Sequence, residues 1–316
     1  MSTQTALSSL PRPERLVGGH LLGLDGITAE EVHYLLDLAA RVKARPADYA
    51  TRLTGKVMAM LFEKPSLRTR ATFEIGMVQL GGHALYFGPN EVGLGKREAV
   101  KDVAKNLSRW ADVIMARVFV HKSVVELAEH GTASVINGLC DLEHPCQALG
   151  DFLTLREHKG DLKGKTLTWL GDGNNVLHSL LFAAARLGVK MRVGTPEGYD
   201  PDSRVVETAR EWGGEVFLTR DPVQAVEGAD AVYTDVWASM GQEAETAERA
   251  KIFRPFQVNE ELMAKAGTNP LFMHCLPAHR GDEVTDGVMD SPNSIVFDQA
   301  ENRLHIQKAI LLALQA

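Results

Sequence analysis

Short apolar runs followed by helix-like stretches recur along the whole chain, and this alternation limits the folds it can adopt. In the first half, the runs that read as buried strands are residues 57–61, 83–87, 113–116 and 133–136. In the second half, they are residues 167–170, 190–193, 215–218, 231–234 and 271–273. Strands that alternate with helices form parallel sheets covered by helices on both faces. We therefore expect an α/β fold with doubly wound parallel sheets.

A chain of 316 residues is long enough for two domains. The expected helices include residues 67–80, 98–110, 145–158 and 301–314. The helix over 145–158 starts with a proline, which the first helical turn favours, and the polar residues 158–161 follow it. We place the boundary near this point. The predicted domains are residues 1–150, joined by the C-terminal helix of about 301–316, and residues 151–300.

Composition and charge exclude several classes of protein. Apolar residues make up 45% and charged residues 24%, which is typical of a soluble globular protein. A net charge of −7 disfavours an extended nucleic-acid or anionic-membrane surface, although it allows a local basic pocket. Three cysteines are too few for a disulfide framework. No signal peptide and no apolar run of about 18 residues is visible. We therefore expect a cytoplasmic protein with no nucleic-acid or membrane partner.

Polar side chains follow the carboxyl ends of several predicted strands, where open parallel sheets bind ligands. In the first half these are residues 66–70, Arg117 and residues 144–147. In the second half they are residues 174–175, Asp235 and residues 274–275. Their shared placement favours a functional interpretation over chance.

The segment from Ser66 to Arg70 carries the strongest local signal. Pro65 ends the preceding element, and Ser66 can cap a new helix. The N–H groups at a helix start, together with hydroxyls and an arginine fork, form an anion site. A solvated, capped helix start has the same pattern, so both interpretations stay open on the residues alone. The nearby Gly95 and Lys96 do not belong to a P-loop, because the first glycine and the Ser/Thr of that motif are missing.

Residues 171–176 resemble a dinucleotide-binding turn only in part. Val176 occupies the position of the third glycine, so close approach of a pyrophosphate is poorly supported. The two asparagines at 174 and 175 either bind a small zwitterion or cap a helix.

The two His/Cys pairs of the chain lack the spacing of a zinc site, so no metal is expected. They are His144 with Cys146 and His274 with Cys275. Cys275 fits either a nucleophile or ordinary packing, and the residues alone do not decide between them.

Two motifs of the first half resemble those shared by the aspartate and ornithine carbamoyltransferase family. Residues 62–70, FEKPSLRTR, resemble its carbamoyl-phosphate motif, and residues 144–147, HPCQ, are similar to its second shared motif. Leu67 replaces a threonine that is common in the first motif, but the backbone can serve at this position.

Motifs of the second half separate the branches of this family. Residues 235–243, DVWASMGQE, are similar to the ornithine-binding loop, and residues 273–278, MHCLPA, to its partner motif. Residues 171–178 and 301–303 also match. Since the motifs appear in the expected order over nearly the whole chain, the chain is identified as a member of this family, on the ornithine branch.

The resemblance implies which residues bind each substrate. The carbamoyl-phosphate residues would be Ser66, Leu67 through its backbone N–H, Arg68, Thr69, Arg117, His144, Gln147 and Arg303. The ornithine residues would be Asn175, Asp235, Ser239, Met240, Cys275 and Leu276. Arg117, His144 and Cys275 would be catalytic, and no cofactor or metal is implied. The active site would lie in the cleft between the two domains.

The implied reaction is direct attack of the ornithine δ-amine on the carbamoyl carbon. A tetrahedral intermediate then expels phosphate and leaves citrulline, so Cys275 would position the substrate without acting as a nucleophile. An ordinary alkylamine has a pKa near ~10.4, so the site must favour its neutral form. We expect the loop over residues 237–243, with Gly241 as a flexible point, to close over ornithine.

The family also implies a homotrimer or a multiple of trimers, and a place in arginine metabolism. His83 stands where a glutamine often reaches into a neighbouring subunit, which leaves that contact open.

Three alternatives compete with this interpretation. A sister carbamoyltransferase would act on aspartate, putrescine or an N-acylated ornithine. Aspartate would need added cations in the second domain, whereas Asp235 suits a substrate ammonium group. Putrescine lacks the α-amino and carboxylate groups that Asp235 and Asn175 are placed to bind. A nicotinamide oxidoreductase is disfavoured by Val176. A non-catalytic homologue would have no need of Arg68, Arg117 and Arg303 together.

Overall fold

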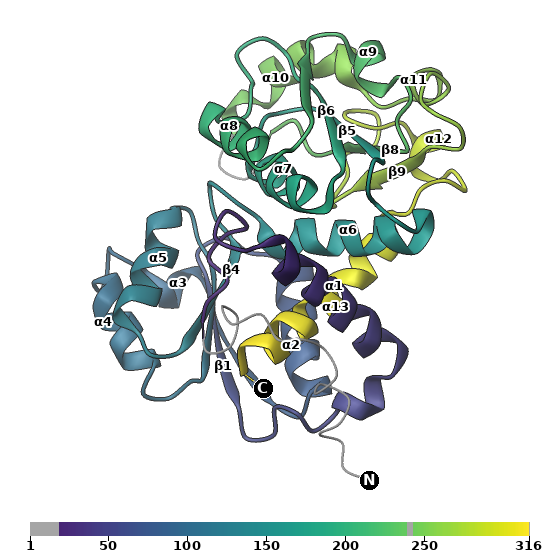
Figure 1. Ribbon diagram of the computed structural model, residues 1–316. Helices are drawn as coiled ribbons and strands as arrows, with labels where there is room; N and C mark the ends of the chain where they lie inside the picture. Colours follow the sequence, from purple (N-terminus) through teal and green to yellow (C-terminus); the bar gives the residue numbers. More distant parts are fainter. Residues whose placement is uncertain (1–18, 239–242, 316) are drawn as a thin grey trace. The chain divides into compact units, whose positions relative to one another are not determined.

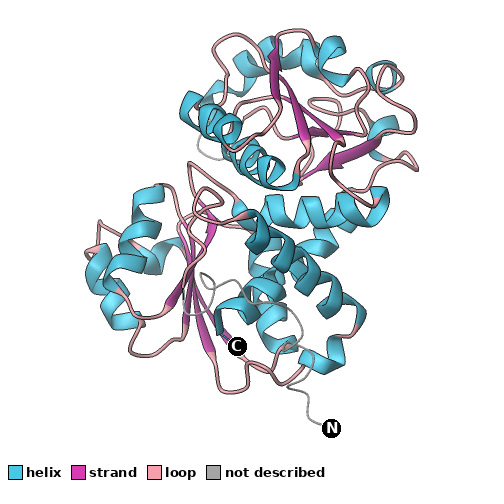
Figure 2. Cartoon of the chain, in the orientation of Figure 1, coloured by secondary structure: helices cyan, strands magenta, loops and turns pink. Residues whose placement is uncertain are grey.

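The computed structural model describes residues 19–238 and 243–315 (Figure 1). The chain divides into two compact units: unit 1 comprises Met1–Leu153 with Glu301–Ala316, and unit 2 comprises Thr154–Ala300. Two helices run through the points of division, α6 (Pro145–Lys159) and α13 (Val296–Gln315). Each unit has strands in its interior and helices around them (Figure 2).

The sheet of unit 1 is parallel, with the strand order β2-β1-β3-β4. Its strands are β1 (Val57–Phe62), β2 (His83–Phe87), β3 (Val113–Arg117) and β4 (Ser134–Leu139). The central strands β1 and β3 are almost wholly apolar because helices cover both faces of the sheet. The strand order reverses between β1 and β3, and the register there places Phe62 opposite Arg117. This is the switch point at which open α/β sheets bind ligands.

Helices cover both faces of the unit 1 sheet (Figure 1). On one face lie α3 (Pro89–Val92), α4 (Val100–Leu107) and α5 (His121–His130). On the other lie α13 with α1 (Ala29–Ala44) and α2 (Leu67–Gln79), and a short 3-10 helix, η2 (Pro46–Tyr49), follows α1. The core under α4 and α5 is made of aliphatic side chains from β3, β4 and these helices, among them Ile114, Val124, Leu127 and Val135.

Unit 2 also has a parallel sheet, with the order β7-β6-β5-β8-β9. Its strands are β5 (Thr166–Leu170), β6 (Lys190–Gly194), β7 (Val216–Thr219), β8 (Ala231–Thr234) and β9 (Leu271–His274). The order reverses between β5 and β8, so the residues that follow these strands share the switch point.

The helices of unit 2 connect these strands and cover the sheet. They are α7 (Asn175–Leu187), α8 (Ser203–Glu211), α9 (Pro222–Val226), η3 (Glu243–Glu245), α10 (Thr246–Phe253), η4 (Arg254–Phe256), α11 (Glu260–Met263) and α12 (Asp286–Met289). A buried apolar cluster joins α9, α11 and α12 to the sheet, and includes Val226, Val232, Leu262 and Phe272.

The predicted fold class, α/β with two parallel sheets, is confirmed, and each predicted strand is present. The helix expected over residues 98–110 is shorter, because Arg109 and Trp110 form turns with i→i+3 hydrogen bonds after Leu107. The last helix begins at Val296, five residues before the predicted start at 301. Within residues 19–238 and 243–315, no helix combines the length and the apolar character needed to cross a membrane.

Candidate active site

The segment after β1 forms a helix start directed by its own sequence. Ser66 is the N-cap of α2, and its Oγ accepts a hydrogen bond from the Thr69 N–H at 3.2 Å. The N–H groups of Leu67 and Arg68 have no acceptor within the helix, because the first turn supplies none. These groups follow β1 directly and therefore lie at the switch point of the unit 1 sheet. Such a helix start favours an anion.

Two guanidinium groups meet on the hydroxyl of Thr69. Arg303 Nη2 donates to Thr69 Oγ1 at 3.0 Å, and Arg117 Nη1 donates to the same oxygen at 3.4 Å. Arg117 ends β3 and Arg303 lies on α13, and all three side chains are buried. Two guanidinium groups held so close together create a strongly positive potential where water is scarce. The arrangement is suited to a small dianion.

The start of α6 adds neutral groups to this cluster. Arg303 Nη1 donates to Gln147 Oε1 at 2.5 Å, and Gln147 Nε2 donates to Asp151 Oδ1 at 2.7 Å. Burial, with the nearby charges of Arg303 and Arg117, holds the pKa of His144 well below its ordinary value of 6.5. His144 is therefore neutral at pH 7 and can donate one N–H without adding a third positive charge.

The structure brings together most of the residues predicted to bind carbamoyl phosphate, from four separate parts of unit 1. Ser66, Leu67, Arg68 and Thr69 come from the start of α2, Arg117 from β3, His144 and Gln147 from the start of α6, and Arg303 from α13. Among the described residues, the guanidinium of Arg68 has no hydrogen-bond or ion-pair partner, so it is available to a ligand. Asp151 was missed, although its position four residues after Gln147 on one helix is a visible signal.

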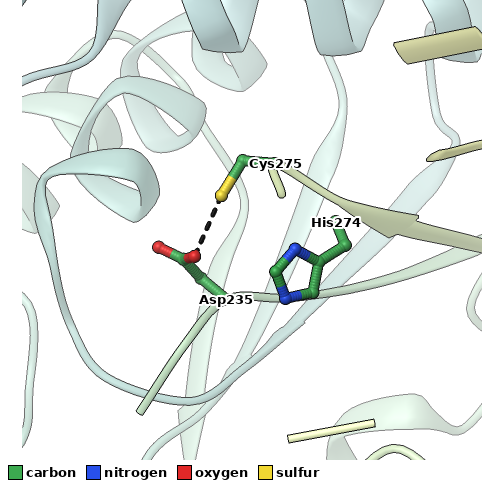
Figure 3. Close-up of side chains that lie close together, drawn as sticks. All are labelled: Asp235, His274 and Cys275. Atoms are coloured by element: carbon green, nitrogen blue, oxygen red, sulfur yellow. Dashed lines mark hydrogen bonds between the residues drawn. The ribbon is translucent and has the colours of Figure 1, made fainter. Parts of the chain in front are cut away.

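In unit 2, three groups donate hydrogen bonds to the buried carboxylate of Asp235. Oδ2 accepts from Asn174 Nδ2 at 2.9 Å, and Oδ1 accepts from the Val236 N–H at 2.8 Å and from the Cys275 thiol at 2.9 Å (Figure 3). Asp235 follows β8 and Cys275 follows β9. These bonds fix the orientation of the carboxylate, whose remaining lone pair suits an ammonium group.

The asparagine that bonds to Asp235 is Asn174, the neighbour of the predicted ornithine residue Asn175. Asn174 is the N-cap of α7, where its Oδ1 accepts from the N–H groups of Val176 and Leu177. It therefore caps the helix, one of the two roles that the sequence left open for the two asparagines, and it also orients Asp235. Asn175 is the first residue of α7 and is partly buried.

The remaining residues predicted to bind ornithine follow β8 and β9 in the sequence. Ser239, Met240 and Gly241, the last of which was predicted to be a flexible point, lie outside the described residues. Leu276 follows Cys275 and has a φ of 59°, an uncommon conformation for a residue with a branched side chain.

Arg249 of α10 joins three segments at the switch point of unit 2, and sequence reasoning missed it. Nη1 donates to Asp172 Oδ2 at 2.9 Å and to the Trp237 carbonyl at 2.8 Å, and Nε donates to Glu245 Oε2 at 2.9 Å. Burial raises the pKa of Asp172 although Arg249 lies beside it. The one visible signal is the spacing of four residues between Glu245 and Arg249.

The group formed by Asp235, His274 and Cys275 has the spacing of a metal site, since its possible ligand atoms lie within 4.8 Å of one another (Figure 3). Both ring nitrogens of His274 have other partners, however. Nδ1 accepts from the Leu276 N–H at 2.8 Å, and Nε2 lies 3.2 Å from Glu283 Oε1. A metal ion would have to displace one of these partners, so this geometry gives no support to a metal.

Comparison with known families covers both halves of the chain. Residues 19–157 match the family model described as aspartate/ornithine carbamoyltransferase, carbamoyl-P binding domain, and residues 163–314 match its Asp/Orn binding domain. The chain belongs to the aspartate/ornithine carbamoyltransferase family. Among curated family members, the "Ornithine carbamoyltransferase, anabolic" of Pyrococcus furiosus is 54% identical over 302 residues, which are 94% of this chain and 96% of that protein. The ornithine carbamoyltransferase of Carboxydothermus hydrogenoformans is 52% identical over 94% of this chain and 97% of its own.

Solved structures of family members have the same fold. The ornithine carbamoyltransferase structure from Pyrococcus furiosus aligns with a TM-score of 0.92 at 53% identity, over 96% of this chain and 99% of that one. The structure from Thermus thermophilus aligns with a TM-score of 0.86 at 50% identity, over 94% and 99% of the two chains.

Proposed function

We propose that this protein transfers the carbamoyl group of carbamoyl phosphate to the δ-amine of L-ornithine, giving L-citrulline and phosphate. The observation that carries the proposal is the meeting of two buried guanidinium groups on Thr69, beside the start of α2. Such a site suits a small phosphorylated anion. Relatives that are more than half identical over nearly the whole chain carry the name ornithine carbamoyltransferase, which supports ornithine as the acceptor.

In this proposal, unit 1 holds carbamoyl phosphate. Ser66, Arg68 and the Leu67 N–H bind the phosphate at the start of α2, and Gln147 and Arg303 complete its surroundings. A hydroxyl has two acceptor lone pairs and one hydrogen. Because Thr69 Oγ1 accepts from two arginines, its hydrogen is left to donate to the ligand.

The carbonyl oxygen of carbamoyl phosphate would receive donors from Thr69, Arg117 and the neutral ring of His144. Negative charge develops on this oxygen as the amine attacks. Each well-placed donor to such an oxyanion contributes about 3 kcal/mol to the lowering of the barrier. Arg117 and His144 are therefore proposed as catalytic residues.

Unit 2 would hold ornithine. The carboxylate of Asp235, oriented by Asn174 and Cys275, faces the α-ammonium group. Asn175 and Leu276 are proposed to complete the contacts. The predicted Ser239 and Met240 belong to the same proposed set.

The reaction would proceed by direct attack of the neutral δ-amine on the carbamoyl carbon. The tetrahedral intermediate then collapses and releases phosphate, whose charge Arg68 and the start of α2 stabilise. The two bound reactants are held in the geometry of attack, which contributes about 7–11 kcal/mol to the lowering of the barrier. Cys275 positions the substrate, and no covalent enzyme intermediate is formed.

The rival acceptors are putrescine and an N-acylated ornithine. Putrescine has no α-carboxylate, and an N-acylated ornithine has no α-ammonium for Asp235. The test offers carbamoyl phosphate with ornithine, putrescine, aspartate or acetylornithine and measures each carbamoylated product. We expect citrulline to dominate. A different product, formed without citrulline, would refute the choice of substrate.

We further propose a homotrimer, or a multiple of trimers, acting in the cytoplasm in arginine biosynthesis. Three exposed apolar side chains of unit 1 support assembly: Ile75 and Val78 of α2 and Leu85 of the edge strand β2 are 46%, 62% and 43% exposed. The word anabolic in the name of the Pyrococcus furiosus relative supports the pathway. Light scattering coupled to gel filtration measures the assembly, and a monomer would refute it.

A further inference from the structure

Residues 20–24 run beside β4, at the edge of the unit 1 sheet, and form the edge segment of this unit. The Leu21 N–H donates to the Val135 carbonyl at 2.8 Å, and the Asn137 N–H donates to the Leu21 carbonyl at 2.8 Å. The Asn137 side chain adds a third bond, from Nδ2 to the Leu22 carbonyl at 2.8 Å. Because the bridge between Leu21 and β4 is parallel, the edge segment follows β4 toward its carboxyl end.

The edge segment ends on the carboxylate of Glu143, which lies between β4 and α6. The Leu24 N–H donates to Glu143 Oε2 at 2.9 Å and lies 3.1 Å from Oε1. Leu24 and Glu143 are both completely buried, so water does not compete for this bond and losing it would be costly. Gly23 leaves room for the carboxylate, because a Cβ at this position would collide with Glu143 Oε1. The backbone of Gly23 and Leu24 therefore fits one side chain of the β4–α6 turn closely.

The turn of residues 140–143 is also closed by its own backbone, next to His144. The Cys140 N–H donates to the Glu143 carbonyl at 3.0 Å, and the Glu143 N–H donates to Cys140 Sγ at 3.3 Å. On the other side of His144, the Cys146 thiol donates to the Asn137 carbonyl at 3.6 Å. Glu143 is thus held through both its backbone and its side chain, and His144 is the next residue of the chain.

His144 has a task that needs accurate placement. It precedes Pro145, the first residue of α6, so it lies outside the regular helix. Its placement therefore depends on the turn before it as well as on the helix after it. A hydrogen bond weakens steeply when its donor moves out of line, and small displacements of a catalytic group slow a reaction strongly.

We propose that Glu143 is a positioning residue for His144 and that the edge segment is its anchor. The bond from Leu24 to Glu143 keeps the turn of residues 140–143 in place, and with it the imidazole of His144. Glu143 acts through the backbone and does not touch the substrate. The proposal rests on the proposed function, in which His144 donates to the carbonyl oxygen of carbamoyl phosphate.

Two substitutions disturb this bond from opposite sides. Glu143→Ala removes the acceptor of the Leu24 N–H, whereas Glu143→Gln keeps an oxygen in its place. Gly23→Ala leaves Glu143 in the chain but pushes its carboxylate away. In Glu143→Ala and Gly23→Ala we expect kcat to fall about tenfold and the KM for ornithine to change by less than about twofold, because a displaced donor loses part of its stabilisation of the transition state. Glu143→Gln should keep kcat within about threefold of the wild type.

The double variant shows whether the two changes act through one contact. Without the Glu143 carboxylate, a methyl group added at Gly23 no longer meets it. We therefore expect Gly23→Ala combined with Glu143→Ala to have the kcat of Glu143→Ala alone, within about twofold. A loss of about 100-fold, the product of two independent tenfold losses, would overturn the proposal.

NMR of the imidazole rings follows His144 without turnover. In protein labelled with carbon-13 in its histidines, the His144 signal is the one that disappears in His144→Gln. Without substrates, we expect this signal to shift in Glu143→Ala and Gly23→Ala and to stay in place in Glu143→Gln.

Ser108→Ala is the matched control at the other end of β4. It removes an Oγ that accepts from the N–H groups of Thr132 and Ala133 at 3.0 and 3.2 Å, just before the strand begins. It should lower the Tm without changing kcat or the His144 signal.

Two further results would overturn the proposal. One is an unchanged kcat and His144 signal in Glu143→Ala and Gly23→Ala, even where their Tm falls, since a purely structural role predicts this. The other is a Glu143→Gln variant as impaired as Glu143→Ala, which would assign the effect to charge. If the wild-type protein makes no citrulline, the proposed function fails, while the NMR signal still tests whether Glu143 positions His144.

Discussion

Replacing Arg249 by methionine removes a charge that joins three segments of unit 2. In the native protein its guanidinium contacts the Asp172 carboxylate, the Trp237 carbonyl and the Glu245 carboxylate. Methionine keeps much of the apolar stem of the side chain. The substitution therefore tests the polar contacts more than the packing.

The magnitude follows from the burial of each partner. The side chains of Arg249 and Asp172 are only 7% and 14% exposed, so Asp172 would be left as a buried, unpaired carboxylate at a cost of about 3–5 kcal/mol. Glu245 is 58% exposed, and losing its ion pair costs less than about 1 kcal/mol. We expect Arg249→Met to lower the free energy of unfolding by about 3–5 kcal/mol. In the double variant with Asp172→Asn no buried charge is left unpaired, and at least about 2 kcal/mol should be recovered.

Urea unfolding followed by far-UV circular dichroism, at one protein concentration, measures these differences. Burial already raises the pKa of Asp172, and loss of Arg249 raises it further. A folded state that binds more protons than the unfolded state loses stability as the pH rises, so the cost should be larger at pH 8 than at pH 6. Arg249→Lys, which keeps the charge, should cost less than Arg249→Met. A loss below about 1 kcal/mol, or a double variant no more stable than the single one, would refute this reasoning.

Three further predictions concern the proposed binding residues. Arg68→Ala should lower kcat/KM for carbamoyl phosphate, measured by steady-state kinetics, by about 10²–10³-fold. The Tm, measured by calorimetry, should stay within about 2 °C of the wild type. The control Arg45→Ala, at an exposed position of unit 1, should change neither kcat/KM nor the Tm. Asp235→Asn should raise the KM for ornithine about 100-fold, the loss expected for one partner of a close charge pair. Binding of carbamoyl phosphate, measured by calorimetry, should stay unchanged. An unaltered KM for ornithine would show that Asp235 does not bind the ammonium group. Because the pKa of His144 is lowered in the folded protein, the unfolded chain takes up a proton below about pH 6.5 that the folded chain does not. As the pH falls from about 6.5 to 5, the free energy of unfolding of the wild type should therefore decrease, relative to that of His144→Gln, by up to about 1.4 kcal/mol per pH unit. Parallel stability curves for the two proteins would contradict the assignment.

The strands were predictable because covered parallel sheets leave a strong pattern in the sequence. The central strands β1 and β3 are continuous apolar runs, which strands with one solvated face do not show. Helix α1 was not predicted, although its capping box of Thr28 and Glu31 is visible in the sequence. The helix predicted over residues 98–110 was too long, because helix propensity does not show where the i→i+4 hydrogen bonds of a helix are replaced by i→i+3 turns.

The candidate site was predictable only where local motifs carry it. Ser66 and Thr69 lie three residues apart, and their capping bond is a local feature. The bond from Arg303 to Thr69 joins residues 234 positions apart, which no spacing rule links, so it came from resemblance alone. Arg249 and Asp151 were missed because each acts on another side chain and is an ordinary helix residue by itself.

Unit 1 begins first along the chain, but unit 2 is completed first during synthesis. Unit 2 is one continuous segment, Thr154–Ala300, whereas unit 1 needs Glu301–Ala316 to be complete. During translation, all residues of unit 2 are therefore made before unit 1 is complete. The first 153 residues can form the whole of unit 1 only after the C-terminal helix has been translated. Arg303 belongs to that late helix and binds Thr69 and Gln147. A nascent chain therefore gains its complete anion-binding cluster only after residues 301–316 leave the ribosome, so an interrupted translation product lacks it.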